Sequence, residues 1–144
     1  MIERLNPWLV LVFCVTLVAP ALAVDHYGNA TDIAAVRKAV PKSIPSAAGA
    51  CAVHANRIVV VATYALVQTF YSDPCGAGAD DLWGKRNGAW VKLAAGKPIM
   101  PPCVMHSKGV PDSTILQLVS RYAGPDYASR AQEGAQKELK ACRH

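Results

Sequence analysis

The hydrophobic pattern of the chain centres on one apolar run, residues 58–70, which is rich in β-branched side chains. Short apolar runs of this kind, bounded by turn residues, are typical of strands. Residues 58–61 do not alternate with polar residues, so we expect this strand to be covered on both faces. The pattern predicts strands over residues 51–61 and 64–71, joined by a turn at residues 62–63.

This first hairpin brings two cysteines close together. A turn at residues 62–63 pairs positions whose numbers sum to about 125, which places Cys51 within about one residue of a position opposite Cys75. Opposed strand positions lie about 4.5–5.5 Å apart, within the reach of a disulfide. Four cysteines allow three connectivities. The register favours Cys51–Cys75 and leaves Cys103–Cys142.

A second hairpin is predicted from residues 80–85 and 89–94, around the dipeptide Asn87-Gly88 that a type I′ turn requires. The resulting register gives one aliphatic face and one face with two Trp–Lys pairs: Leu82 opposite Leu93, Gly84 opposite Val91, Trp83 opposite Lys92 and Lys85 opposite Trp90. If the second face is exposed, its indole rings and ammonium groups suit a sugar or an anionic polymer. In the alternative, helices cover the indole rings and the lysines extend to solvent.

Helices are predicted on both sides of these hairpins. Asp32 can cap a helix over residues 33–40, which Pro41 ends, and residues 41–50 are expected to form a loop. Further helices are expected over residues 103–108, 112–122 and 127–142, the last pinned by a Cys103–Cys142 bridge. Because short turns join neighbouring strands, we predict an α+β fold. It has an N-terminal helix, a four-strand antiparallel β-meander, C-terminal helices packed on one face and two disulfides.

The first 23 residues are typical of a secretory signal peptide. Arg4 precedes an apolar segment over residues 9–18, and Ala21-Leu22-Ala23 forms a cleavage site before Val24. An uncleaved anchor is the alternative, although residues 8–24 reach only the lower limit of a membrane span. We therefore expect one exported domain over residues 24–144, with a core at about 32–123 and a helical tail at 125–144. Its expected location is periplasmic or secreted, without a stable membrane span after cleavage.

Charge and cysteine usage narrow the function classes. The formal net charge is +5, which suits either anionic partners, such as cell-wall polymers and lipid head groups, or simple solubility. Runs of Lys and Arg never exceed two residues, which favours the solubility interpretation. We expect no nucleic-acid partner. No C-x-x-C motif occurs, which removes support for a thioredoxin-type centre or a zinc ribbon.

The densest group of potential metal ligands is Met100, Cys103, Met105 and His106. Thioether, thiol and imidazole groups are soft donors that select Cu(I), and Met100, Met105 and His106 remain available if Cys103 is oxidised. In the alternative, the methionines fill gaps in the core. Asp80 and Asp81 are neighbours on a strand and should point to opposite faces, which argues against a carboxylate dyad. We identify no catalytic residues.

Three segments carry a resemblance to a known group: Tyr64-Ala65-Leu66-Val67, then residues 85–90 (KRNGAW), then Gly109-Val110-Pro111. Over about residues 53–122, the chain resembles small, exported, mostly uncharacterised bacterial periplasmic proteins. Some members are encoded beside copper-uptake systems, so the resemblance lends weight to the copper hypothesis. The chain departs from the group at residues 94–96, which replace a richer glycine run.

These observations predict a non-enzymatic periplasmic or secreted binding or interaction protein. Its expected partner is an envelope protein or a cell-wall glycan, bound at the surface formed by Trp83, Lys85, Trp90 and Lys92. The alternative is a copper-handling accessory protein that uses Met100, Met105 and His106. The sequence leaves the oligomeric state open.

Overall fold

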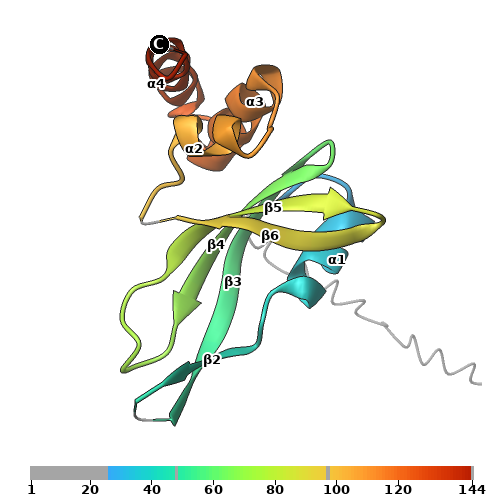
Figure 1. Ribbon diagram of the computed structural model, residues 1–144, viewed down its shortest axis with the longest axis vertical. Helices are drawn as coiled ribbons and strands as arrows, with labels where there is room; N and C mark the ends of the chain where they lie inside the picture. The colour runs from blue at the N-terminus through green and yellow to red at the C-terminus, as the bar shows by residue number, and fades with distance from the viewer. Residues whose placement is uncertain (1–25, 48, 97, 144) are drawn as a thin grey trace, which may run out of the picture.

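The protein has an α+β fold with a mixed six-stranded sheet, four helices and two disulfides (Figure 1). The computed structural model describes residues 26–47, 49–96 and 98–143. The predicted signal peptide, its alternative as an anchor and the cleavage site lie outside these residues. Within them, no helix has the length and apolar character needed to span a membrane.

The ten elements include two short strands that precede and follow the first helix. Their order is β1 (His26–Tyr27), α1 (Ala30–Ala39), β2 (Ser43–Ser46), β3 (Gly49–Val61), β4 (Tyr64–Tyr71), β5 (Ala79–Arg86), β6 (Ala89–Ala95), α2 (Pro102–Ser107), α3 (Asp112–Ala123) and α4 (Ala128–Ala141). The strand order in the sheet is β1-β3-β4-β5-β6, and β2 pairs with the outer end of β3. In Figure 1, helices α2–α4 gather at one end of the molecule, and the β2 end of the sheet extends away from them.

The prediction of a four-strand, purely antiparallel sheet is wrong in strand number and direction. Strand β1 runs parallel to β3, and β2 adds an antiparallel pair to it. Neither strand has a clear sequence signal, because β1 is two residues long and β2 contains Pro45. Proline is compatible with an outer strand that donates no hydrogen bond at that position.

The predicted N-terminal helix is wrong in its start and its cap. The described chain opens with β1, and helix α1 begins at Ala30, three residues before the predicted start. Asn29 is the N-cap, and its side-chain oxygen accepts a hydrogen bond from the backbone N–H of Thr31 at 2.8 Å. Asn is among the most favourable N-cap residues, and Asn29 has the capping role that was predicted for Asp32. Asp32 is thereby left in the first turn.

The central strands are apolar on both faces, and each face has its own core cluster. One cluster joins Val59, Leu66 and Leu82 to residues of α2, α3 and α4, while the other joins Ile58, Val60, Ala65, Val67 and the two tryptophans to Val36 and Val40. Neighbouring strand residues therefore alternate between the two clusters, as strand geometry requires. Helix α1 covers one face, and the C-terminal helices cover the other.

The two hairpins form around the predicted turns, but each contains an irregularity. Asn87 and Gly88 have φ values of 50° and 79°, as a type I′ turn requires. A register shift after Leu82 places it opposite Ala94, whereas Leu93 was predicted there. A second register shift lies between Ala55 and Arg57 in the first hairpin. Beyond it, the residue numbers of paired positions add up to one less than they do near the turn.

Both predicted disulfides are confirmed. The Cα atoms of Cys51 and Cys75 lie 6.1 Å apart, and those of Cys103 and Cys142 lie 5.8 Å apart. The first bond closes the outer end of the β3–β4 hairpin. The second bond ties the C-terminal end of α4 to α2.

Replacing Cys103 and Cys142 together with alanine should lower the free energy of unfolding by about 4 kcal/mol, because their bond closes a long loop in the unfolded chain. Their positions are 39 residues apart in sequence. Amide hydrogen exchange should rise most in α4, which loses its covalent attachment to α2. The Cys51→Ala/Cys75→Ala variant is the matched control and should instead loosen residues 72–78. Unchanged exchange in α4 would contradict the assigned role of the Cys103–Cys142 bond.

Candidate functional site

The two indole rings of the predicted Trp–Lys surface are buried. Trp83 and Trp90 are only 4% and 7% exposed and pack beneath α1 with Val36 and Val40. Their indole rings are therefore not available to stack on a ligand. Helix α1 covers this face of the sheet, which is the alternative arrangement that the sequence left open for the indole rings.

The two lysines of this set reach the molecular surface and pair with carboxylates. Lys85 Nζ lies 2.8 Å from Asp32 Oδ1, and Lys92 Nζ lies 2.8 Å from Asp81 Oδ2. Each ammonium group also lies within 6 Å of the centre of an indole ring. The lysines thus cover the edge of the tryptophan cluster. Their ion pairs and ring contacts stabilise the fold.

The potential copper ligands are divided between the core and the surface. Met100 and Met105 are buried in the core cluster beneath the C-terminal helices. His106 is partly exposed, and its Nδ1 lies 2.9 Å from Asp112 Oδ1. Among the described residues, no group of three or more His, Cys, Asp or Glu side chains is placed to hold a metal ion. The methionines have the packing role that was the alternative interpretation.

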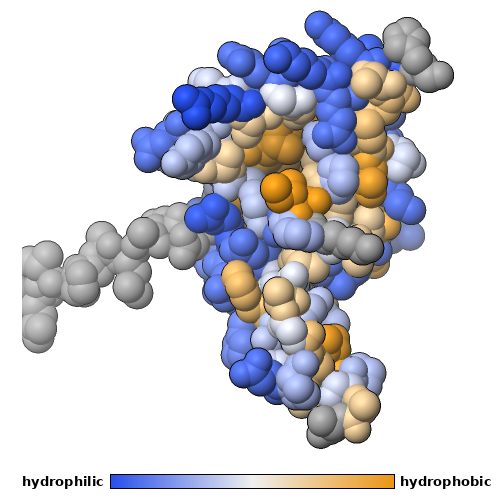
Figure 2. Space-filling model, turned by 90° about the vertical axis from the view of Figure 1, so that its left-hand side faces the viewer, coloured by the Kyte–Doolittle hydropathy of each residue, from blue (hydrophilic) through white to orange (hydrophobic). Residues whose placement is uncertain are grey.

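A cleft of about 480 Å³ lies between the sheet and the C-terminal helices. Its lining is mainly aliphatic and includes Leu66, Ile99, Met100, Val119, Ala131 and Ala135. Figure 2 shows apolar side chains gathered in a hollow on one face of the molecule, with hydrophilic side chains around it. Ile99 is 75% exposed and is the most exposed large apolar residue among those described.

Helix α4 leaves space for the cleft because three of the four residues in its inner row are small. Ala131, Gly134, Ala135 and Glu138 line the cleft at helical spacing. A Cβ atom added to Gly134 would meet no atom within 4 Å. Larger residues in this row would fill the space between α4 and the sheet, so the cleft follows from the composition of α4.

Asp80 is the buried polar centre of the cleft wall. It lies on β5 and is only 3% exposed. Its Oδ1 accepts a hydrogen bond from the Tyr122 hydroxyl group of α3, and its carboxylate also accepts one from the backbone N–H of Met100. Asp80 therefore joins the sheet, helix α3 and the connection between β6 and α2.

The backbone of Asp80 also holds the connection between β6 and α2. The N–H of Gly96 donates to the carbonyl oxygen of Asp80 at 2.7 Å. A Cβ atom at residue 96 would lie 2.1 Å from this oxygen, so only glycine allows this close approach. The connection that carries Ile99 and Met100 is held against β5 in this way.

Arg57 supplies the positive charge of the cleft wall. Its guanidinium group donates to the carbonyl oxygen of Tyr122 at 2.8 Å and lies 5.7 Å from the centre of the Tyr122 ring. The residues Asp80, Tyr122 and Arg57 thus form one polar group at the boundary of the sheet and α3. All three line the cleft.

The pKa values of Asp80 and Tyr122 are both raised by their surroundings. Burial raises the pKa of Asp80 above its ordinary value of 3.8, and the negative charge of Asp81 adds to this, although the Tyr122 hydrogen bond and Arg57 oppose it. The pKa of Tyr122 is also raised, first by burial and then by its hydrogen bond to Asp80. The phenol therefore stays protonated and acts as a hydrogen-bond donor.

The neighbouring carboxylate, Asp81, belongs to the opposite face of the sheet. It is buried, and it pairs with Lys92, which lies over Trp83. Its Oδ1 has no hydrogen-bond partner among the residues that the structure describes. Asp80 and Asp81 thus have separate partners, as the alternation of strand side chains predicted.

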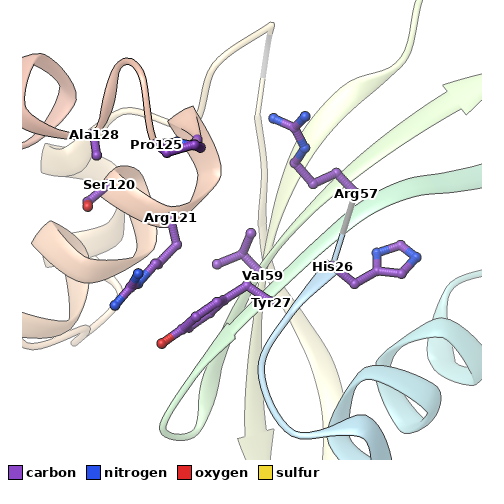
Figure 3. A pocket seen from close by; sticks show the side chains of 9 residues that line it. His26, Tyr27, Arg57, Val59, Ser120, Arg121, Pro125 and Ala128 are labelled. Atoms are coloured by element: carbon purple, nitrogen blue, oxygen red, sulfur yellow. The ribbon is translucent and has the colours of Figure 1, made fainter. Parts of the chain in front are cut away.

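A second cavity, of about 370 Å³, lies on the other side of Arg57. Figure 3 shows Arg57 and Arg121 on opposite sides of this recess, with Val59 between them and the ring of His26 turned away. Arg121 lies 4.5 Å from the centre of the Tyr27 ring, and His26 Nδ1 accepts from the backbone N–H of Ile58 at 3.1 Å. These contacts attach β1 to the sheet and to α3, so the polar groups of this cavity have a structural role.

No family model, curated protein or solved structure matches this chain. The functional argument therefore depends on the cleft itself. Sequence reasoning missed its polar group, because Asp80, Tyr122 and Arg57 lie on three different elements. The available signals were a carboxylate at the start of a buried strand and a tyrosine on the apolar face of a helix.

Trp83→Ala should act on stability. Removing this buried ring should lower the free energy of unfolding by about 3–5 kcal/mol, because it leaves a cavity under α1. Urea denaturation followed by circular dichroism measures this change. The control Val91→Ala, on the neighbouring edge strand, alters a partly exposed side chain and should cost less than about 1 kcal/mol. A loss below 1 kcal/mol for Trp83→Ala would contradict the buried position of the ring.

The raised pKa of Asp80 predicts a specific pH dependence of stability. Because the folded chain holds this proton more tightly than the unfolded chain, Asp80 contributes stability below pH 3.8. That contribution is lost as the pH rises through the raised pKa. Between pH 4 and pH 7, stability should therefore fall more, or rise less, in the unmodified protein than in Asp80→Asn. Urea denaturation at both pH values tests this, and an identical pH dependence in the two proteins would refute it.

Proposed function

We propose that this chain is an exported, non-enzymatic binding protein whose site is the cleft between the sheet and helices α3 and α4. The ligand is a small molecule that is mainly apolar and carries one polar group. The observation that supports this proposal is a buried carboxyl group, Asp80, in the wall of an otherwise largely aliphatic cleft. A few polar groups in an apolar pocket fix the orientation of a ligand.

The dimensions and packing of the cleft suit such a ligand. Its volume of about 480 Å³ lies in the range of roughly 300–1,000 Å³ that is usual for small-molecule sites. Its walls come from secondary-structure elements and from a connection that hydrogen bonds hold to Asp80. A site with such supported walls is largely formed before the ligand binds.

The polar group favours binding over catalysis. The Tyr122 hydroxyl group has a raised pKa and is a poor base or nucleophile near neutral pH. Asp80 is held by two hydrogen-bond donors. Their joint role in this proposal is to present a carboxyl group at the cleft wall.

Location outside the cytoplasm is part of this proposal. Two disulfides are compatible with an oxidising compartment, and the sequence predicts a signal peptide. The aromatic rings that would suit a glycan are covered by α1, so the cleft replaces the Trp–Lys surface as the proposed binding site. An apolar small molecule fits this cleft better than a glycan does.

Gly134→Leu should abolish ligand binding by filling the cleft. The new side chain has room at its Cβ position, and replacing glycine within a helix stabilises it by roughly 0.5–1 kcal/mol. Isothermal titration calorimetry with 1-octanol measures binding, and thermal denaturation measures the fold. Gln136→Leu places the same side chain on an exposed position of α4 and should bind 1-octanol as the unmodified protein does. Equal binding by all three proteins would refute the cleft as the site.

A further inference from the structure

The cleft is locally acidic, although the whole chain is basic. The chain has a formal net charge of +5, yet the described residues that line the cleft include two carboxylates, Asp80 and Glu138, and one guanidinium group, Arg57. Asp81 does not alter this balance, because Lys92 pairs with it on the opposite face of the sheet. With both carboxylates ionised, the lining therefore carries an excess of one negative charge.

The two carboxylates come from opposite walls of the cleft. Asp80 lies on β5, whereas Glu138 lies on the inner row of α4. Glu138 Oε1 accepts a hydrogen bond from the backbone N–H of Cys103 at 3.2 Å, which holds the side chain close to α2. A ligand between the sheet and α4 thus meets a carboxylate from each side.

The guanidinium group of Arg57 contacts Tyr122. Its guanidinium group donates to the Tyr122 carbonyl oxygen and lies over the Tyr122 ring. The upward shift in the pKa of Asp80 shows that Arg57 and the Tyr122 hydrogen bond do not fully offset the burial of this carboxylate. A further cation next to Asp80 would reduce that electrostatic cost.

We propose that the ligand of this cleft is a cationic amphiphile, in which a protonated amine is attached to an apolar body. This inference rests on the proposed function, since it specifies the ligand class of the same cleft. The apolar body packs against the aliphatic lining, and the ammonium group pairs with Asp80 and Glu138. An ammonium group has three hydrogen-bond donors and no acceptor, which complements carboxylate oxygens.

An anionic head group fits the same lining poorly. A carboxylate or phosphate bound at Arg57 would lie in a cleft that already contains Asp80 and Glu138, and like charges repel strongly where water is scarce. A hydroxyl head group can donate a hydrogen bond to a carboxylate, but it gains no attraction between opposite charges and is not repelled. The charge of the lining therefore ranks the three head groups in the order ammonium, hydroxyl, carboxylate.

Three probes with the same eight-carbon chain test this ranking: octylamine, 1-octanol and sodium octanoate. Their dissociation constants are measured by isothermal titration calorimetry with the oxidised chain at pH 7, where octylamine is protonated and octanoate is ionised. We expect octylammonium to bind at least about tenfold more tightly than octanoate, which corresponds to about 1.4 kcal/mol. Octanol should bind with intermediate affinity.

Two conservative variants assign the preference to the carboxylates. Asp80→Asn and Glu138→Gln each remove one charge and keep an amide oxygen as an acceptor. Each should weaken octylammonium binding severalfold and 1-octanol binding much less, because the amide oxygen still accepts a hydrogen bond from a hydroxyl group. Thermal denaturation reports that the fold is intact. Gln136→Leu is the control and should keep the full preference for octylammonium. If neither carboxylate variant weakens octylammonium binding, the inference is wrong.

The pH dependence of binding provides a second readout of Asp80. Other charged and titratable groups that face it are Asp81 on β5, Arg57 on β3, Tyr122 on α3 and Glu138 on α4. Because its pKa is raised, Asp80 takes up a proton at a higher pH than an ordinary aspartate does, and it then loses its attraction for a cation. Octylammonium binding should therefore weaken as the pH is lowered from 7 toward 4. The pH effect should be much smaller for 1-octanol, and it should be smaller for octylammonium in Asp80→Asn.

The outcomes separate this inference from the proposed function. If octanoate binds most tightly and Gly134→Leu abolishes its binding, the cleft is the site but the cationic ligand class is wrong. If none of the three probes binds, or if Gly134→Leu leaves binding unchanged, the proposed function itself fails. Tightest binding of octylammonium, lost in Gly134→Leu and weakened in Asp80→Asn, supports both.

Discussion

The structure depends on the burial of strands β3–β5 on both faces. Their central residues alternate between two apolar clusters, so neither face of the sheet can remain in contact with water. Two helical layers meet this requirement, with α1 on one face and α2–α4 on the other. The positions of the tryptophans, the methionines and the cleft all follow from how completely each layer covers its face.

Coverage differs between the two faces. On the α1 face, Val36 and Val40 close over Trp83 and Trp90, and the lysines cover the margin of this cluster. On the opposite face, α4 presents a row of small residues and leaves a cleft beside α3. The same construction, a helix laid over a strand surface, thus gives a filled core on one side and a binding cavity on the other.

Local patterns in the sequence predicted much of the fold. The Asn87-Gly88 turn, the hairpin closed by Cys51–Cys75 and the three C-terminal helices each depend on residues close together in the chain, or on a simple register. Strands β1 and β2 could not be predicted because pairing with β3, and not their own composition, makes them strands. The same limit applies to the cleft. Asp80, Tyr122 and Arg57 meet only after α3 has packed on the sheet, and no spacing in the sequence encodes that contact.

The Cys103–Cys142 bond makes the attachment of helix α4 covalent at both ends. Its N-terminal end follows α3 through residues 124–127, and its C-terminal end is bonded to α2. The cleft-lining residues Ala131 and Glu138 lie between these two attachments. A wall that is tied at both ends has little conformational freedom to lose when a ligand binds, and such preorganisation favours affinity. One oxidised pair of cysteines thus prepares the cleft before any ligand arrives.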